Sequence, residues 1–266
     1  KKIKEIIEQL DGRFPNYFGI QRFGVVRPIT HLVGEKIVRG DYQGAVWDYL
    51  TKGGSEAMGG EARESLRNNK DWKEALEKFP YHLLFERQII GHLNRNHDDY
   101  IGALRQLPES LSKMLVHGYQ SLIFNRVLDQ RIREGIDIQI PQIGDNVIPA
   151  DNYGGPDQRR IIQVTERNQA KLEKRCNEGK AWIAGLLPGI KSEYTNGIQG
   201  SIERTVMKEE NVGFKDFIIE DMPELSSLGT YRPLHQNVNA LRWELDENEN
   251  PVFNFWLYKG TYATSF

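Results

Sequence analysis

The stretch that says most about the fold is Pro15–Gly24, which reads PNYFGIQRFG. It sets three aromatic side chains, an asparagine, a glutamine and an arginine among a proline and two glycines, a mixture unusual for an exposed loop. Glycine lets the backbone approach a partner closely, an aromatic face can stack on a base, and arginine pairs well with phosphate. The residues alone leave two interpretations open: a loop that binds nucleic acid, or a buried turn whose aromatic side chains belong to the core.

Length and charge limit the possible architectures. At 266 residues the chain is long enough for two domains, or for one domain that carries an insertion. Charged residues make up 27%, hydrophobic residues 39%, and the mean hydropathy is -0.58, values typical of a soluble globular protein. The formal net charge of -2 shows no global basic bias, so a surface that binds nucleic acid has to be a local patch.

Several classes of protein are disfavoured by what the sequence lacks. No apolar run approaches membrane-spanning length, and the first residues lack the apolar stretch of a signal peptide. Cys176 is the single cysteine, which excludes an internal disulfide and a thiolate zinc site, and the six histidines form no H-x-x-x-H pair of the zinc-binding type. We therefore expect a cytoplasmic protein that needs no metal and binds no membrane.

The first half of the chain shows helical periodicity. Apolar residues recur at helical spacing through residues 3–10, 30–38 and 41–50, with Thr30 and Asp41 as predicted N-caps. The helical pattern continues from about residue 60 to 135. Within it, Asp71 is a further predicted N-cap, and a long amphipathic helix is predicted to follow Leu107–Pro108 and extend through Ile132.

The second half adds strand patterns. Alternating residues predict a strand at 136–140, and short apolar runs predict strands at 161–164 and 181–184. Two further helices are expected, one capped by Thr165 and running through Cys176, the other at 202–210. Residues 238–245 and 252–258 flank a polar turn and predict a β-hairpin.

A cluster of polar residues lies inside the predicted long helix, where residues 117–125 read HGYQSLIFN. The polar residues His117, Gln120, Ser121 and Asn125 recur at a spacing of three to four. Gly118 in a helix interior costs about 1 kcal/mol relative to alanine, which indicates close packing or the approach of a partner. The alternatives here are a polar helix face without further role, or a functional surface.

These two segments together resemble a known family. Residues 15–24 resemble the NYFGxQRFG signature of the TruD family of tRNA pseudouridine synthases, and residues 117–125 are similar to its H-x-YQS-x-x-FN stretch. Three weaker similarities follow in family order: the LPG turn at 187–189, the G-x-x-RP segment at 229–233 and the terminal G-[ST]-[FY]-AT segment at 260–264. The helix-rich middle of the chain resembles archaeal or eukaryotic members of the family.

One departure from the family pattern concerns catalysis. The family's catalytic aspartate lies upstream of the NYFG run, in a GxKDxxAxT-type segment that residues 1–266 do not contain. None of the aspartates present matches that segment. We therefore expect residues 1–266 to be a portion of a longer polypeptide, inactive by itself, with the N-terminal segment that holds the nucleophile absent.

The resemblance implies an α/β (α+β) fold with two parts. Residues 1–50 and 234–266 would form an incomplete, mixed-sheet pseudouridine synthase catalytic domain. Residues 51–233 would form a large inserted α/β domain special to the family, and the cleft between the two would receive tRNA. The glycine-rich stretch at 52–55 is consistent with a boundary near residue 50.

The implied activity is an isomerase that converts a uridine of tRNA, position 13 in the family's typical substrate, to pseudouridine without a cofactor or a metal. By resemblance, Asn16 orients the catalytic aspartate and Phe18 packs against the target base. Gln21, Arg22, Arg232 and Lys259 are the predicted RNA-binding residues, although a structural ion pair would explain Arg22 equally well. A monomer is favoured.

Two other readings stay open at this stage. The first is a non-catalytic RNA-binding module that keeps the same fold, which the missing aspartate segment supports. The second is an unrelated α/β protein in which the matches arose by chance, an interpretation that the shared order of the segments disfavours.

Overall fold

The computed structural model describes residues 2–10, 12–53 and 58–266, so that Gly54 and Ser55 of the predicted 52–55 loop lie outside the described residues. Helices dominate the first half of the chain and small sheets the second, which confirms the predicted mixture of helix and strand. The helices are α1 (Lys2–Leu10), α2 (Thr30–Val38), α3 (Tyr42–Thr51), α4 (Gly60–Asn69), α5 (Trp72–Lys78), α6 (Leu84–Arg95), α7 (Tyr100–Leu104), α8 (Glu109–Arg133), α9 (Gln169–Asn177) and α10 (Gly197–Glu209), with short 3-10 turns η1 (Ile20–Arg22), η3 (Phe214–Phe217), η4 (Pro223–Leu225) and η5 (Ala263–Ser265).

The strands form three small sheets in which the described pairs are antiparallel. One has the order β3-β2-β4-β5, and the others are the pairs β1-β6 and β7-β8. Their bounds are β1 (Arg13–Pro15), β2 (Asn146–Pro149), β3 (Ile162–Gln163), β4 (Ala181–Leu187), β5 (Thr230–Pro233), β6 (His235–Asn237), β7 (Asn239–Leu245) and β8 (Pro251–Trp256). The pairing of β1 with β6 joins two segments from opposite ends of the chain, and it thereby places residues 15–24 beside the strands at 230–237.

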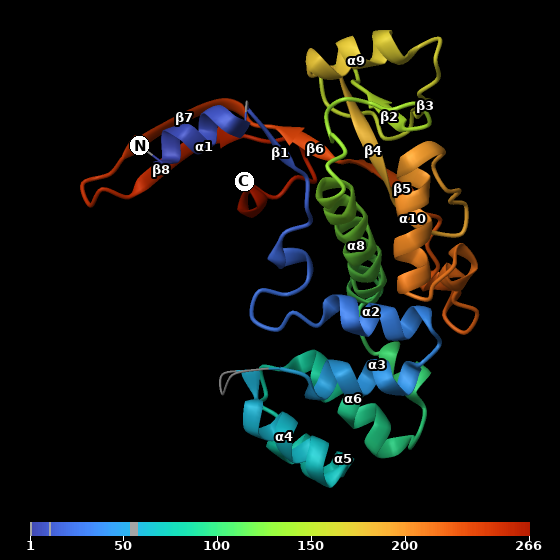
Figure 1. Cartoon of the computed structure of the whole chain (residues 1–266). Helices are drawn as coiled ribbons and strands as arrows, with labels where there is room; N and C mark the ends of the chain where they lie inside the picture. Colours follow the sequence, from blue (N-terminus) through green and yellow to red (C-terminus); the bar gives the residue numbers. More distant parts are fainter. Residues whose placement is uncertain (1, 11, 54–57) are drawn as a thin grey trace.

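Helix α8 runs through the middle of the molecule, and α2 crosses it at one end (Figure 1). The crossing explains two glycines. A Cβ atom at Gly34 would lie 2.0 Å from the carbonyl oxygen of Leu115, and one at Gly118 would lie 2.8 Å from Cγ2 of Thr30. Larger side chains would push the helices apart, so close packing accounts for Gly118, as its position in the helix interior indicated.

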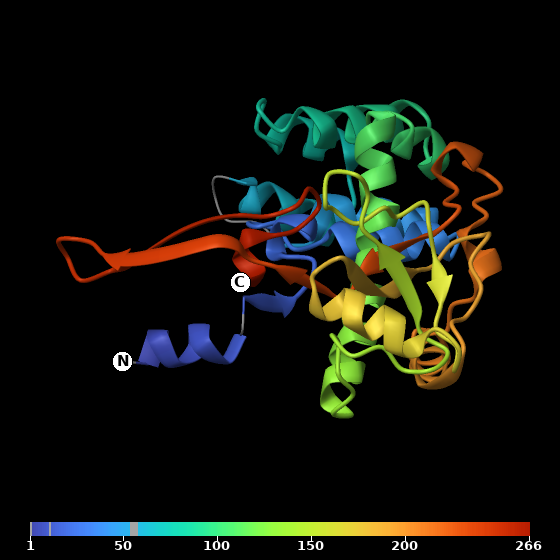
Figure 2. The same cartoon turned by 90° about the horizontal axis from the view of Figure 1, so that it is seen from above.

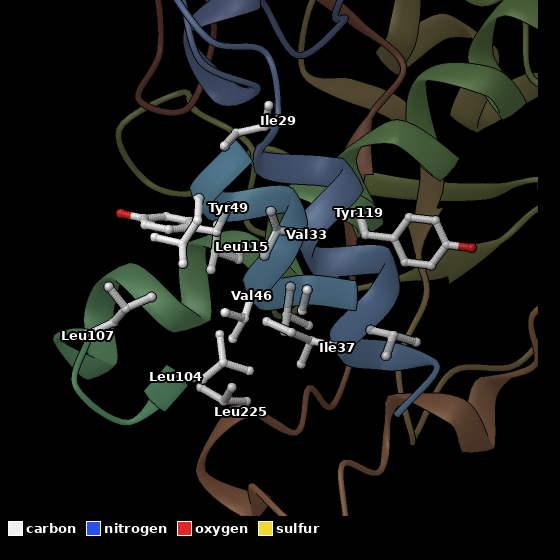
Figure 3. Packing of buried hydrophobic residues seen from close by; sticks show 14 of the residues in the cluster. Ile29, Val33, Ile37, Val46, Tyr49, Leu104, Leu107, Leu115, Tyr119 and Leu225 are labelled. Atoms are coloured by element: carbon white, nitrogen blue, oxygen red, sulfur yellow. The ribbon is translucent and has the colours of Figure 1, made fainter. Parts of the chain in front are cut away.

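The largest buried cluster surrounds this crossing. Figure 3 shows part of it, where Val33 and Ile37 of α2 meet Val46 of α3 and Leu115 of α8. The cluster extends from Ile29 to Leu225 and therefore includes α2 and α3 together with the helices that follow residue 58. The domain boundary near residue 50 stays a prediction, and the packing adds that α2 and α3 share a core with the middle of the chain.

The hairpin of β7 and β8 extends away from this core as an arm (Figures 1 and 2), and residues of α1 and β8, among them Ile6 and Phe253, line one pocket. The predicted hairpin at 238–258 is confirmed, with register pairs from Arg242–Asn254 to Leu245–Pro251. No helix in the described part of the chain has the length and the apolar character that crossing a membrane requires.

Three details of the predicted elements are wrong. Thr30 is the first residue of α2 and makes no capping bond, and the N-cap of α9 is Asn168, whose Oδ1 accepts the amide hydrogen of Thr165. Residues 136–140 form no strand, because Oδ1 of Asp137 accepts the backbone N–H groups of Gln139 and Ile140 and bends the chain. The N-caps Asp41 and Asp71 are confirmed.

Candidate active site

A cavity of about 690 Å³ lies where the similar segments meet. Each of the segments singled out in the sequence contributes to its wall, and they come from η1, α8, the end of β4, β5, β6 and the C-terminal stretch. The lining residues are Asn16, Phe18, Arg22, His117, Gln120, Pro156, Gln158, Leu187, Ser227, Leu228, Gly229, Thr230, Arg232, Pro233, Gln236, Lys259, Gly260 and Tyr262. Asn16 and Phe18 both line this cavity, together with Lys259 and Gly260 of the C-terminal stretch.

Asn16 is fixed at both ends of its side-chain amide. Its Oδ1 accepts from Nη2 of Arg232 at 2.7 Å, and its Nδ2 donates to the carbonyl oxygen of Pro233 at 2.9 Å. Its backbone N–H donates to the carbonyl oxygen of Leu234 at 2.9 Å. Asn16 is only 1% exposed. Because Nδ2 carries two hydrogens and uses one here, the side chain retains one donor for a further acceptor.

Arg232 joins the segments at the base of the cavity. Besides Oδ1 of Asn16, its guanidinium donates to the backbone oxygen of Asn16 at 3.2 Å and to that of Gly260 at 2.6 Å. These contacts leave two of its five N–H donors unused. Among the described residues, Arg232 forms no ion pair with a carboxylate. Burial lowers the pKa of Arg232 to about 10, which still leaves it charged at neutral pH.

Phe18 is half-buried and surrounded by aromatic and cationic groups. The ring centroid lies 3.9 Å from Cζ of Arg232 and 5.5 Å from Cζ of Arg22. The rings of Phe124 and Tyr262 lie at 5.5 and 5.9 Å. The cation–π contacts hold both guanidinium groups beside an aromatic surface that also lines the cavity.

The loop at 15–24 is attached to α8 by side chains of the second polar segment. Asn125 accepts the backbone N–H of Phe18 at 2.9 Å and donates to its carbonyl oxygen at 3.0 Å. Ser121 accepts from Nε of Arg22 at 3.0 Å and donates to the carbonyl oxygen of His117. Burial, followed by the charge of Arg22, lowers the pKa of His117, so this imidazole is neutral at pH 7.

Gln120 extends the same network to the LPG turn. Its Nε2 donates to the carbonyl oxygen of Pro188 at 2.5 Å and to Oγ of Ser227 at 2.7 Å. Gln120 is 5% exposed and Ser121 is fully buried. The polar residues at 117–125 therefore do not form a solvent-facing helix surface; they connect the loop, the turn and the helix into one wall.

The predicted RNA-binding residues are placed differently from one another. Arg22 and Lys259 line the cavity, with Lys259 exposed and Arg22 half-buried, whereas Arg232 lies deeper, at 5% exposed. Gln21 does not contribute to the wall. Its Oε1 accepts from Oγ1 of Thr264 at 2.9 Å, on the outer side of the loop.

The charge of the cavity wall differs from that of the whole chain. Arg22, Arg232 and Lys259 contribute three cationic groups, and among the described lining residues there is no aspartate or glutamate. The complete chain, by contrast, has a net charge of -2. A concave surface of one sign concentrates ligands of the opposite sign, so this wall favours an anion.

Sequence reasoning missed some members of the wall. Tyr262 lies within the terminal segment that resembles the family, so its position could have been inferred from that segment. Gln236 lies three residues after the RP segment, and no pattern marks it. Gln158 reaches the rim from the loop between β2 and β3, a tertiary contact that periodicity does not reveal.

The chain is similar to known proteins over its whole length. The family model described as tRNA pseudouridine synthase D (TruD) matches residues 1–266. A probable tRNA pseudouridine synthase D from Methanosarcina mazei is 40% identical over 273 residues, which is 100% of this chain and 62% of the relative. The corresponding protein from Methanopyrus kandleri is 39% identical over 259 residues, or 96% of this chain and 56% of the relative.

A solved structure is similar over nearly the same extent. The crystal structure of a tRNA pseudouridine synthase D from Methanosarcina mazei superposes with a TM-score of 0.91 and 38% identity, and the match covers 99% of this chain and 62% of that one. The chain thus spans about three-fifths of the length of the relatives it matches. Since the family model extends from the first residue to the last, the chain belongs to the TruD family.

Proposed function

We propose that the protein containing residues 1–266 is a tRNA pseudouridine synthase that isomerises a uridine to pseudouridine, with no cofactor or metal. The observation that supports this most is the cavity wall itself. It combines an aromatic ring, three cationic groups and an asparagine with a spare donor, and it holds no carboxylate among the described residues. This is a wall suited to one base and the phosphates beside it.

The proposed chemistry begins with the target nucleotide leaving its stack, at a cost of a few kcal/mol. Packing of the base on Phe18 offsets this by about 1–3 kcal/mol. An aspartate then attacks C1′ as the bond from C1′ to N1 breaks, and the base turns. C5 next bonds to C1′ as the aspartate is released, C5 loses its proton, and N1 gains one. The atoms of the nucleoside are conserved, so no oxidant or reductant is needed.

Asn16 is assigned the positioning of the aspartate. Its unused Nδ2 hydrogen can donate to a carboxylate oxygen, and its contacts with Arg232 and Pro233 fix the direction of that donor. Arg22 and Lys259 are assigned to backbone phosphates because both line the cavity and form no ion pair among the described residues. Gln21 is assigned a contact with RNA outside the cavity.

The remaining proposals concern organisation. We retain residues 1–50 and 234–266 as parts of the catalytic domain and 51–233 as the inserted domain, with tRNA bound between them. A cytoplasmic monomer is proposed, since the substrate is tRNA. The alternative is a non-catalytic RNA-binding module of the same fold, which would bind the same base and phosphates without converting the uridine.

The test is pseudouridine-specific chemical mapping of tRNA after incubation with the full-length protein and, separately, with residues 1–266. The full-length protein should modify one uridine without added metal. Phe18→Ala should lower turnover about fivefold to a hundredfold while the protein remains folded, because it removes base packing worth about 1–3 kcal/mol. Tight tRNA binding with no pseudouridine from the full-length protein would select the binding-module alternative.

A further inference from the structure

Gln236 is a buried side chain whose amide has no partner. It lies in β6, is 3% exposed and contributes to the wall of the cavity. Its Oε1 makes no hydrogen bond to the described residues, and its Nε2 makes none either. Buried amides are nearly always satisfied in folded proteins, so one that is not needs an explanation.

The neighbouring amides on the same wall give a direct contrast. Asn16 uses both ends of its amide, and Nε2 of Gln120 donates to Pro188 and Ser227. Gln236 thus differs from these two amides of the wall, whereas Nε2 of His235 and Oδ1 of Asn237, on either side of it in β6, also make no hydrogen bond to the described residues. Gln236 keeps an unused donor and an unused acceptor, and the acceptor Oε1 is buried.

We infer that Gln236 recognises the imide edge of the target uracil, an inference that rests on the proposed function. Uracil presents an N3–H donor flanked by the O2 and O4 acceptors. A carboxamide matches two adjacent groups of that edge: Oε1 accepts from N3–H, and Nε2 donates to a neighbouring carbonyl oxygen. A turn of the terminal amide about χ3, a soft torsion, brings either atom toward the cavity. Gln236 thus determines specificity for the base. It takes no part in the bonds that break and form.

Recognition of this kind predicts an unusual pair of effects. Gln236→Met keeps an unbranched side chain of similar length and removes the unsatisfied amide. The free protein should be as stable as the wild type or more stable, whereas turnover on tRNA should fall about tenfold, because the base loses its hydrogen bonds. A residue needed only for folding would lose stability and turnover together.

The decisive experiment compares two substrates in single-turnover assays with the full-length protein: tRNA carrying uridine at the target position, and the same tRNA carrying 3-methyluridine there. Wild-type protein should convert the methylated site at least about tenfold more slowly, since N3 no longer donates. Gln236→Met should convert both at nearly the same reduced rate. Gln106→Leu, at an exposed glutamine that does not line the cavity, is the matched control and should retain the wild-type ratio.

The outcomes separate the two levels of the proposal. If wild-type protein forms no pseudouridine from uridine, the proposed function fails. If it does, and Gln236→Met keeps the wild-type ratio between the two substrates, the assignment of Gln236 to the uracil edge is wrong. Gln236→Leu provides the same comparison should the methionine variant fold poorly.

Discussion

Two arginines of this molecule are almost equally buried and yet are held in opposite ways. Arg131, at the end of α8, uses all of its N–H donors: two contacts to Asp145 at 2.9 and 2.8 Å, two to the carbonyl oxygen of Asp137, and one to Oε1 of Gln199. Arg232 contacts only uncharged oxygens and keeps two donors unused. Arg131 is fully buried and Arg232 is 5% exposed.

The difference separates a structural group from a functional one. A buried charge is costly unless it is paired, and Arg131 is paired as completely as a guanidinium can be. Arg232 faces a cavity instead, and the rings of Phe18, Phe124 and Tyr262 surround it. We propose that a bound anion compensates its charge through the two donors that remain unused. On this proposal Arg131 serves the fold alone, whereas Arg232 joins segments of the wall and also contributes to binding.

The largest expected effect is on the structural side. Arg131→Met should lower the free energy of unfolding by about 3–5 kcal/mol, because it leaves Asp145 buried without its partner. Chemical denaturation at neutral pH measures this. Arg133→Met is the control on the same helix; its ion pair with Asp129 is exposed and contributes about 0.5 kcal/mol or less. Equal losses in the two variants would contradict the role given to Arg131.

The second prediction concerns a buried imidazole, His235, three residues after Arg232 in the chain. Burial lowers the pKa of His235 to about 4, although its ring accommodates a hydrogen bond to the carbonyl oxygen of Ile138 at 2.8 Å. In the unfolded chain the His235 imidazole binds a proton near pH 6.5, whereas in the folded protein it binds one only near pH 4. Stability should therefore fall by about 3 kcal/mol as the pH drops through this window.

The variant His235→Asn isolates that contribution, because an asparagine can still donate to Ile138 and has no charge to gain. Denaturation curves at pH 7 and pH 4.5 should show a smaller acid loss in the variant than in the wild type. Identical acid losses would mean that His235 does not resist protonation in the folded protein.

The third prediction addresses Arg232 directly. Arg232→Met removes three hydrogen bonds to neutral groups but also a buried charge without a carboxylate, so the net loss of stability should be about 2 kcal/mol or less. Turnover of the full-length protein on tRNA should nonetheless fall about a hundredfold, because the anion that we propose to bind at the unused donors of Arg232 loses its positive partner. Stability loss matching that of Arg131→Met, measured in the same denaturation series, would remove the distinction between the two arginines.

The smallest effects are expected at the rim. Arg22→Gln and Lys259→Gln should each weaken tRNA binding a few-fold and reduce the slope of log affinity against log salt by about 1 or slightly less. Filter binding across a salt series measures both quantities. Lys73→Gln on α5 replaces an exposed lysine that does not line the cavity and should leave the slope unchanged.

Local chemistry made some of the fold predictable. Asp41 and Asp71 cap helices because a carboxylate can accept the free N–H groups of a first turn, and this needs no distant partner. The strand expected at 136–140 failed for a related reason: Asp137 captures two backbone N–H groups within its own segment. Alternating isoleucines do not reveal that competition.

The residues of the candidate site were largely predictable from the sequence, but the contacts between them were not. Asn16, Phe18, Arg22 and Lys259 were found from the resemblance, and they meet in one cavity. That Asn125 would bind both backbone groups of Phe18 depends on a contact between residues 107 positions apart, which no local pattern specifies. Gln236 was not predicted at all, because a lone glutamine in a short strand has no sequence signature.

The most direct test of the contrast between the two arginines is the NMR signal of their guanidinium groups as tRNA is added to the full-length protein, with assignments from Arg131→Lys and Arg232→Lys variants. The Nε–Hε resonance of Arg232 should shift on binding as an anion takes up its unused donors, while that of Arg131 should stay in place. An Arg232 signal that does not respond to bound tRNA, or an Arg131 signal that moves as far, would contradict the account.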